Sequence, residues 1–185
     1  LLTAAMSQSG FKVTGIDIAP ERYKDSIDAL QLDVTKCDVE NNRLPFPDNS
    51  FDAVIFNELF EHLRINPILT LSEALRVLRM GGIFMMSTPN LRSLHGIKNF
   101  IFKNRSYSCA GDIYNEYMKL EKLGHMGHVR EYTTNEIRDF LQHIGFRVTH
   151  AIFRGAYDNW IENQLIRIRP NLSPFVSIIA IKKST

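Results

Sequence analysis

Four predicted strand ends carry polar side chains that could bind a ligand. They are Asp17, Asp38, Asn57 with Glu58, and the run 87–90. In an open α/β sheet, ligands bind beyond the carboxyl ends of the strands. The Asp17 carboxylate could accept hydrogen bonds from two ribose hydroxyls, because an ionised carboxylate offers only acceptors. Asp17 could instead cap the helical segment that starts near Pro20, or face solvent.

Histidines form a second group of candidate residues. An imidazole can take up a proton near neutral pH, so His62, His125 and His128 are candidate bases. His125 and His128 are three residues apart, as metal ligands can be, but no other Cys or His cluster supplies a third ligand. We therefore expect no metal site. The alternative for the segment 125–132 is a solvent-facing loop whose Tyr132 packs under the next helix.

The apolar pattern predicts alternating helices and strands that would hold these residues in place. Helices are expected at 1–6, 20–30, 66–80, 134–144 and 159–168, and strands at 11–17, 32–39, 51–56, 83–86, 146–153 and 177–182. Thr133 with Glu136 predicts a helix start, while Gly145 and the pair Gly81-Gly82 predict helix ends. This order is typical of an α/β fold with a Rossmann-like, doubly wound, mostly parallel sheet, with 177–182 as a closing edge strand.

The regular pattern stops after Asn90. Two short helices are predicted within the segment 91–130, at 94–102 and 113–123, and we interpret this segment as a helical insert or lid. Its aromatic residues could line a substrate pocket or form a small core of their own. The whole chain, 1–185, is expected to form one domain.

Composition excludes several classes of protein. The 185 residues carry a formal charge of only +2, which does not favour a nucleic-acid partner. The two cysteines lie far apart, which favours a reduced, cytoplasmic environment. The longest late apolar run, 175–181, is far shorter than the roughly 20 residues of a membrane span. A sheet edge could pair with a second copy to give a homodimer.

Three segments together resemble a known family. They are Leu44-Pro45-Phe46-Pro47-Asp48-Asn49-Ser50-Phe51-Asp52-Ala53-Val54, then Asn57-Glu58-Leu59-Phe60-Glu61-His62-Leu63, and finally Glu73-x-x-Arg76-Val77-Leu78-Arg79-x-Gly81-Gly82. With Gly15-Ile16-Asp17 before them, they occur in the order found in class I S-adenosylmethionine-dependent methyltransferases that act on small molecules, such as the methyltransferase-11, methyltransferase-23 and ubiquinone-biosynthesis groups. The family's first strand and its glycine-rich loop should precede Leu1, so we expect an N-terminally incomplete domain.

The resemblance implies roles for individual residues. Asp17 would bind the ribose hydroxyls of S-adenosylmethionine, and Ile18 would pack on the adenine. Asp38 would accept a hydrogen bond from the adenine amino group, with Val39 beside it. Asn57 would face the methionine part of the cofactor or the substrate.

Two histidine-containing segments resemble family segments near the substrate. The segment with Glu61 and His62 lines the reaction centre in some relatives and only begins a helix in many others. The segment that contains His128 resembles a stretch that approaches the substrate opening in relatives acting on quinone precursors, sugars or lipids. His62 and His128 are therefore the candidate catalytic residues.

The implied activity is methyl transfer from S-adenosylmethionine, with S-adenosylhomocysteine as product, to an oxygen, carbon or nitrogen of a small molecule. The cofactor supplies the leaving group, so the protein mainly aligns the reactants. One alternative is a methyltransferase-like domain that has lost cofactor binding. Another is an NAD-dependent oxidoreductase, in which Asp17 would suit the ribose equally well, but the segment 44–54 would then have no role.

Overall fold

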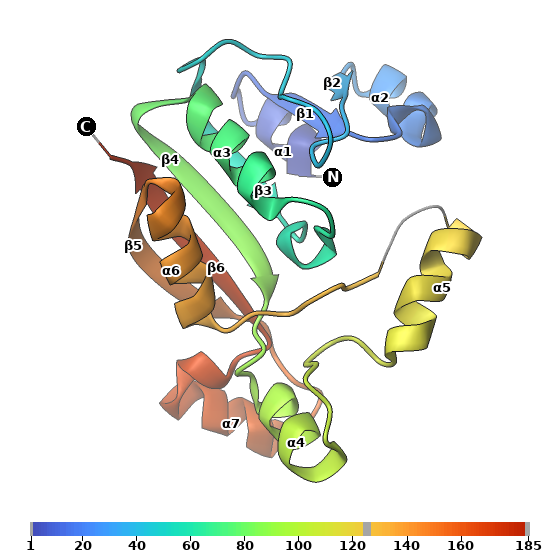
Figure 1. Ribbon diagram of the computed structural model, residues 1–185, viewed down its shortest axis with the longest axis vertical. Coiled ribbons are helices and arrows are strands. Elements are labelled where there is room, and N and C mark those ends of the chain that lie inside the picture. Colours follow the sequence, from blue (N-terminus) through green and yellow to red (C-terminus); the bar gives the residue numbers. More distant parts are fainter. Residues whose placement is uncertain (1, 124–126, 184–185) are drawn as a thin grey trace. The chain divides into compact units, whose positions relative to one another are not determined.

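The computed structural model describes residues 2–123 and 127–183, and these form two compact units, Leu1–Pro45 and Phe46–Thr185 (Figure 1). Each unit has its own sheet. The first sheet has two strands and the second has four.

The first unit contains one parallel strand pair with its connecting helices. Its elements are α1 (Leu2–Gln8), β1 (Thr14–Asp17), η1 (Pro20–Tyr23), α2 (Lys24–Ala29) and β2 (Asp33–Lys36). The register places Thr14 opposite Asp33 and Asp17 opposite Lys36. The strand predicted at 32–39 is shorter than expected, because the backbone turns at Asp38, whose carbonyl accepts the Asn42 N–H at 2.9 Å. The carboxyl ends of β1 and β2 therefore lie side by side, as in an open α/β sheet.

The second unit is built on a four-stranded sheet in the order β3-β4-β6-β5. Its strands are β3 (Phe51–Asn57), β4 (Leu78–Pro89), β5 (Phe146–Arg154) and β6 (Phe175–Lys182). The β3 and β4 strands are parallel, whereas β6 runs antiparallel to both of its neighbours. The segment predicted as an edge strand is thus an interior strand, hydrogen-bonded on both sides. The place of this strand in the sequence does not reveal its place in the sheet, because the last strand of a chain can insert between two earlier strands.

Helices cover one face of this sheet. Helix α3 (Pro67–Val77) contacts both β4 and α6 (Thr134–Ile144), which also contacts β5 (Figure 1). Beneath them, the Phe84 ring lies 6.0 Å from the Phe56 ring and 4.6 Å from the Phe146 ring, centroid to centroid. This apolar core holds β3 and β4, and hence the loops at their carboxyl ends, in place.

The remaining elements of this unit lie between the strands. Element η2 (Phe60–His62) follows β3, whereas α4 (Leu94–Lys103), α5 (Ile113–Leu123), α7 (Trp160–Ile168) and η3 (Pro170–Leu172) lie between β4 and β6. The two helices predicted in the segment 91–130 are thus observed as α4 and α5. The α6 capping box of Thr133 with Glu136 and its end at Gly145, with φ +119°, are confirmed.

The predicted end of the 66–80 helix is wrong. Helix α3 ends at Val77, and β4 runs from Leu78 straight through Gly81-Gly82. Strand pairing overrides the helical pattern, because Leu78 already pairs with Phe51. The register then shifts so that Ala53 faces Ile83, and the intervening bulge is where Gly81 adopts a φ of +70°. The glycines therefore permit a bulge instead of ending a helix.

Arg76 joins two of the segments that carry the family resemblance. Its guanidinium donates to both carboxylate oxygens of Glu73, at 2.9 and 2.8 Å. It also reaches the Phe46 carbonyl at 2.8 Å and the Asp48 carboxylate at 2.7 Å. The segment 46–54 is thereby fixed against α3, which sets where β3 begins.

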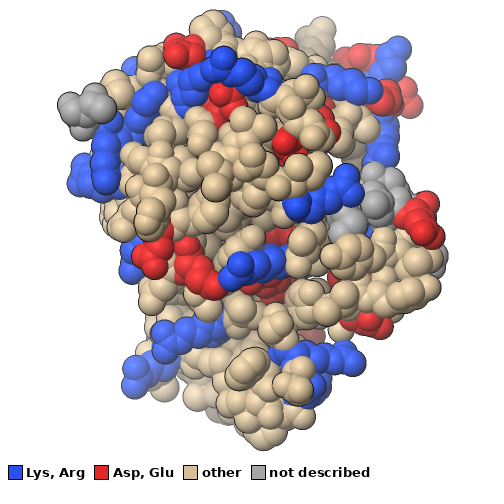
Figure 2. All heavy atoms as spheres, in the orientation of Figure 1, with Lys and Arg blue, Asp and Glu red and all other residues tan. Residues whose placement is uncertain are grey.

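Charges of both signs occur on the face shown in Figure 2, where Lys and Arg gather along the upper left edge and Asp and Glu lie beside them and on the right. This distribution agrees with the small formal charge of +2. Within the described ranges, no helix combines the length and the apolar character that crossing a membrane requires.

Candidate active site

Asp17 ends β1 and shapes the turn that follows. Its Oδ1 accepts the Ala19 N–H at 2.7 Å, while Ile18 between them is 56% exposed. The carboxylate thus fixes a turn before η1. This role is close to the alternative in which Asp17 caps the helical segment near Pro20. The same turn presents Ile18 as an exposed apolar side chain beside the end of β1.

Asp38 lies just past β2 and closes a second turn in the same unit. Its Oδ1 accepts the Glu40 N–H at 3.0 Å, and its Oδ2 accepts the Asn41 side-chain amide at 2.8 Å. Val39 is half-buried within this turn. The predicted residues Asp17, Ile18, Asp38 and Val39 therefore all lie at the carboxyl edge of the β1–β2 pair.

In the second unit, Asn57 is the exposed last residue of β3. Glu58 follows it with a φ of +49°, a left-handed conformation that is unusual outside glycine. Its N–H donates to the Ser87 carbonyl at 2.8 Å, and its Oε1 accepts from the Ser87 hydroxyl and from Arg154, each at 2.7 Å. These contacts hold the strained backbone and direct the chain into η2.

Glu61 in η2 is the most unusual side chain of this region. It is only 1% exposed, and its Oε2 accepts the Thr88 hydroxyl at 2.9 Å. Its Oε1 accepts no hydrogen bond from the residues that the structure describes. A buried polar atom without a partner is rare in folded proteins and calls for an explanation.

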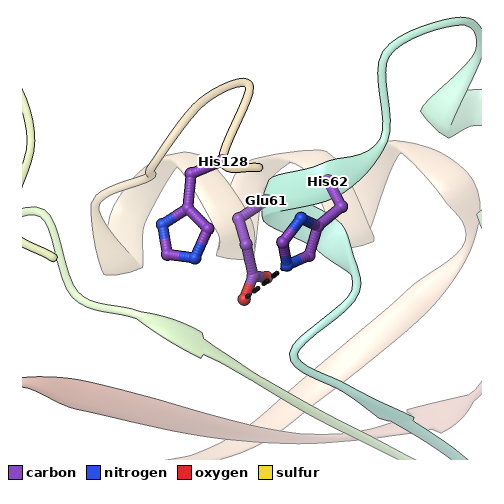
Figure 3. A group of neighbouring side chains, drawn as sticks. All are labelled: Glu61, His62 and His128. Carbon is purple, nitrogen blue, oxygen red and sulfur yellow. Dashed lines mark ion pairs between the residues drawn. The ribbon is translucent and has the colours of Figure 1, made fainter. Parts of the chain in front are cut away.

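Two imidazoles, His62 and His128, flank this carboxyl group (Figure 3). The Nε2 of His62 lies 4.0 Å from Glu61 Oε1, and the two rings meet at a centroid distance of 5.0 Å. The Nδ1 of His62 lies 3.0 Å from the Gly127 carbonyl, which can only accept, so Nδ1 carries the proton. The structure thus brings together the two predicted catalytic residues.

The segment after Gly127 is tied to η2. The Glu61 carbonyl accepts the Val129 N–H at 2.8 Å, and the His128 Nδ1 lies 3.1 Å from Glu131 Oε1. Glu131 is buried, and backbone N–H groups of Ser108, Cys109 and Ala110 donate to its carboxylate. The alternative of a solvent-facing loop is therefore wrong for the region around His128 and Glu131.

Tyr132 packs as that alternative expected. Its ring lies 4.4 Å from the Phe60 ring, which in turn lies 5.5 Å from Phe140 of α6, centroid to centroid. His125, a third candidate base, lies outside the described residues.

The environment shifts the proton affinities of these groups in opposite directions. Burial raises the pKa of Glu61 to about 7, although backbone and Thr88 hydrogen bonds oppose the rise. Burial would also raise the pKa of Glu131, but the hydrogen bonds from His128 and Ser108 outweigh it and lower that pKa to about 2. The hydrogen bond to Glu131 raises the pKa of His128. Such separated proton affinities are typical of catalytic sites.

Two acidic residues of this site, Glu61 and Glu131, are not singled out by the sequence. Glu61 stands out there only as the neighbour of His62, and Glu131 only as part of the segment 125–132. A signal for Glu131 is its carboxylate close to His128 in the sequence, because carboxylates often orient the histidine rings of functional sites. Nothing in the sequence indicated that Glu61 would be buried.

Comparisons with known proteins agree with this architecture. Residues 1–86 match the family model described as "Methyltransferase domain". Among solved structures, a SAM-dependent methyltransferase from Methanosarcina mazei matches 98% of this chain and 86% of its own, with a TM-score of 0.65 and 17% sequence identity. The fold is therefore that of the class I methyltransferases.

Two curated relatives show local sequence similarity. A 2-methyl-6-phytyl-1,4-hydroquinone methyltransferase of Synechocystis is 39% identical over 85 residues, which are 45% of this chain and 26% of that protein. A ubiquinone biosynthesis O-methyltransferase of Xanthomonas campestris is 36% identical over 95 residues, 49% of this chain and 39% of that protein. In sequence over residues 1–86, and in fold, the chain is thus similar to the class I S-adenosylmethionine-dependent methyltransferases. It spans well under half the length of these relatives.

Proposed function

We propose that this protein transfers the methyl group of S-adenosylmethionine to a hydroxyl oxygen of a small molecule. Asp17 binds the ribose hydroxyls, Ile18 packs on the adenine, and Asp38 with Val39 contacts the adenine edge. Asn57 faces the methionine part of the cofactor or the acceptor. These roles follow the family's positions and are supported by the observation that all five residues lie at or just beyond the ends of β1, β2 and β3.

The observation that carries the choice of a hydroxyl is the cluster of Glu61, His62 and His128. Methyl transfer from a sulfonium forms an oxygen–carbon bond, breaks the carbon–sulfur bond and releases the hydroxyl proton. A neutral hydroxyl is a poor nucleophile, so a group that removes its proton accelerates the reaction. A neutral amine attacks through its free electron pair and loses its proton only afterwards, so it depends less on such a group. The cluster lies directly after β3, where an acceptor in this fold approaches.

The candidate proton acceptors are the two imidazoles. The Nδ1 of each is engaged, with the Gly127 carbonyl for His62 and with Glu131 for His128. Such contacts fix the ring orientation and tautomer of a base, as they do in catalytic triads. The ubiquinone biosynthesis O-methyltransferase of Xanthomonas campestris, which is 36% identical over 95 residues, supports an oxygen acceptor.

The test is a product assay with the 185-residue chain. The chain is incubated with S-adenosylmethionine and, separately, with phenols, catechols, hydroquinones, amines and active-methylene carbons, and both products are identified by mass spectrometry. The proposal expects O-methylated product with matching S-adenosylhomocysteine. His62→Gln should lower the rate by about tenfold or more, in the range of general-base effects. His143→Gln, on the exposed side of α6, is the matched control.

Transfer to amines or carbons alone would contradict the oxygen acceptor. Binding of cofactor without any transfer would instead favour the non-catalytic alternative.

A further inference from the structure

Glu61, His62 and His128 lie close enough together to bind one metal ion after small movements of their side chains. Each offers one ligand atom, and these atoms all lie within 4.8 Å of one another. Zinc-type bonds of about 2.0–2.2 Å place ligand atoms about 3.4 Å apart in a tetrahedral site. Side-chain rotations that move each ligand atom by about 1 Å would bring the three atoms to that spacing. In the sequence, His125 and His128 have no third ligand from another Cys or His cluster, which is why no metal site is expected there. The fold supplies Glu61 and His62 from another segment instead.

An independent observation points to a missing ligand. Glu61 is 1% exposed, its Oε1 has no hydrogen-bond partner among the described residues, and this oxygen faces the His62 ring (Figure 3). A cation would satisfy this oxygen, as buried carboxylates are otherwise paired or hydrogen-bonded.

Hydrogen bonds from residues outside the cluster also fix the orientation of all three side chains, as is usual for metal ligands. Thr88 holds the Oε2 of Glu61 at 2.9 Å, which directs Oε1 toward the cluster. The Gly127 carbonyl and the Glu131 carboxylate hold the Nδ1 atoms of His62 and His128, so that each ring carries its proton on Nδ1. A neutral ring protonated there binds metals through Nε2. Carboxylate–histidine and carbonyl–histidine contacts of this kind are typical outer contacts of metal sites.

We propose that Glu61, His62 and His128 bind one divalent transition-metal cation, of the class of Mn²⁺ or Zn²⁺. Two imidazole nitrogens and one carboxylate oxygen form a ligand set that suits such ions and leaves coordination positions open.

The role of the cation, unlike its binding, rests on the proposed function. An acceptor hydroxyl bound at an open position would lose its proton more readily, because a cation stabilises the oxyanion. The proton passes to solvent, the oxygen attacks the methyl carbon, and the carbon–sulfur electron pair stays on sulfur. With a cation bound, His62 and His128 act as its ligands, and the role of proton acceptor proposed above applies only to the metal-free protein.

Metal binding is tested on the tag-free, chelator-treated chain without cofactor or acceptor. Mn²⁺ is titrated and followed by calorimetry and by loss of the free-ion electron paramagnetic resonance signal, and Zn²⁺ is titrated in parallel. We expect one saturable Mn²⁺ site per chain and a metal-dependent rise in melting temperature. Glu61→Gln, which keeps the shape of the side chain, and His128→Ala should each weaken binding at least tenfold. His143→Ala, on the exposed side of α6, should bind as the wild type does.

Absence of saturable binding up to millimolar Mn²⁺ and Zn²⁺ would overturn the proposal. Binding that is equally tight in Glu61→Gln and His128→Ala would overturn it too, since the ion would then lie elsewhere, for example on Cys37 or Cys109. The methyl-transfer proposal can fail separately. If the chain binds Mn²⁺ but transfers no methyl group, the metal-site proposal stands and the methyl-transfer proposal is wrong. Unchanged transfer to hydroxyls after metal removal keeps the function and assigns the imidazoles as bases.

Discussion

The imidazole rings of His62 and His128 meet edge to face with their centroids 5.0 Å apart, although they come from separate segments of the chain. His62 lies in η2, after β3, and His128 lies in the segment 127–133 that leads into α6. The contact depends on backbone hydrogen bonds from Val129 and Arg130 to the Glu61 carbonyl. It makes the cluster sensitive to changes that displace either segment.

Gly127 is predicted to be required for this contact. A Cβ placed there would lie 1.7 Å from the Glu116 Oε2, an impossible distance, so Gly127→Ala must displace the segment or the carboxylate. We expect the free energy of unfolding to fall by about 1–3 kcal/mol, as for overpacking elsewhere, and Mn²⁺ affinity to fall with it. Urea denaturation measures the first effect. Gly111→Ala is the matched control, because nothing lies within 4 Å of its Cβ. Equal stability of the two variants would refute the packing argument.

Glu131 is predicted to make the free energy of unfolding depend on pH in the acid range. Its pKa is about 2 in the folded chain against 4.5 as the ordinary value, so the folded state favours the ionised form. Its contribution, about 3 kcal/mol from this shift, is fully present above pH 4.5 and is lost as the pH falls toward 2. Glu131→Gln should therefore be less stable than the wild type at neutral pH, by a margin that shrinks in acid.

Denaturant titrations at a series of pH values check this prediction, with the exposed Glu121→Gln as control. The difference in unfolding free energy between the wild type and Glu131→Gln could instead stay constant from neutral pH down to about pH 2. That result would show that the variant loses stability through packing and not through charge.

Arg76 is predicted to stabilise the junction between the run 44–54 and α3. Its side chain is 16% exposed, and its partner Glu73 is 8% exposed. Arg76→Gln leaves the Glu73 carboxylate buried without its bidentate partner, which should cost about 2–4 kcal/mol of unfolding free energy. Thermal denaturation followed by circular dichroism tests the change. The exposed Arg138→Gln on α6 should change the melting temperature little, and a similar loss in both variants would argue against a specific role for Arg76.

Local rules explain which parts of the fold were predictable. Thr133 with Glu136 and Gly145 satisfy the ends of α6 by contacts within a few residues, so the sequence alone predicts that helix. The bulge at Gly81-Gly82 was not predictable in the same way, because the pairing of Leu78 with Phe51 decides it. The interior position of β6 likewise depends on which strands hydrogen-bond to it, and this leaves no local trace.

The candidate site divides along the same line. Asp17, Asp38 and Asn57 could be located because each follows a predicted strand. The cluster could not, since burial of Glu61 depends on Thr88 and on the backbone of Val129, which the fold brings together. Spacing in the sequence therefore joins His128 with His125, whereas the fold places His128 beside Glu61 and His62.

The most direct test of the central claim, that this protein uses S-adenosylmethionine, is calorimetric titration of S-adenosylhomocysteine into the 185-residue chain and into Asp17→Ala. The account predicts saturable binding that Asp17→Ala weakens at least tenfold, because each hydrogen bond to a charged group contributes about 1.5–3 kcal/mol. Asp28→Ala, at an exposed position of α2, should bind as the wild type does. Absence of binding by the folded chain, or equal binding by Asp17→Ala, would contradict the account.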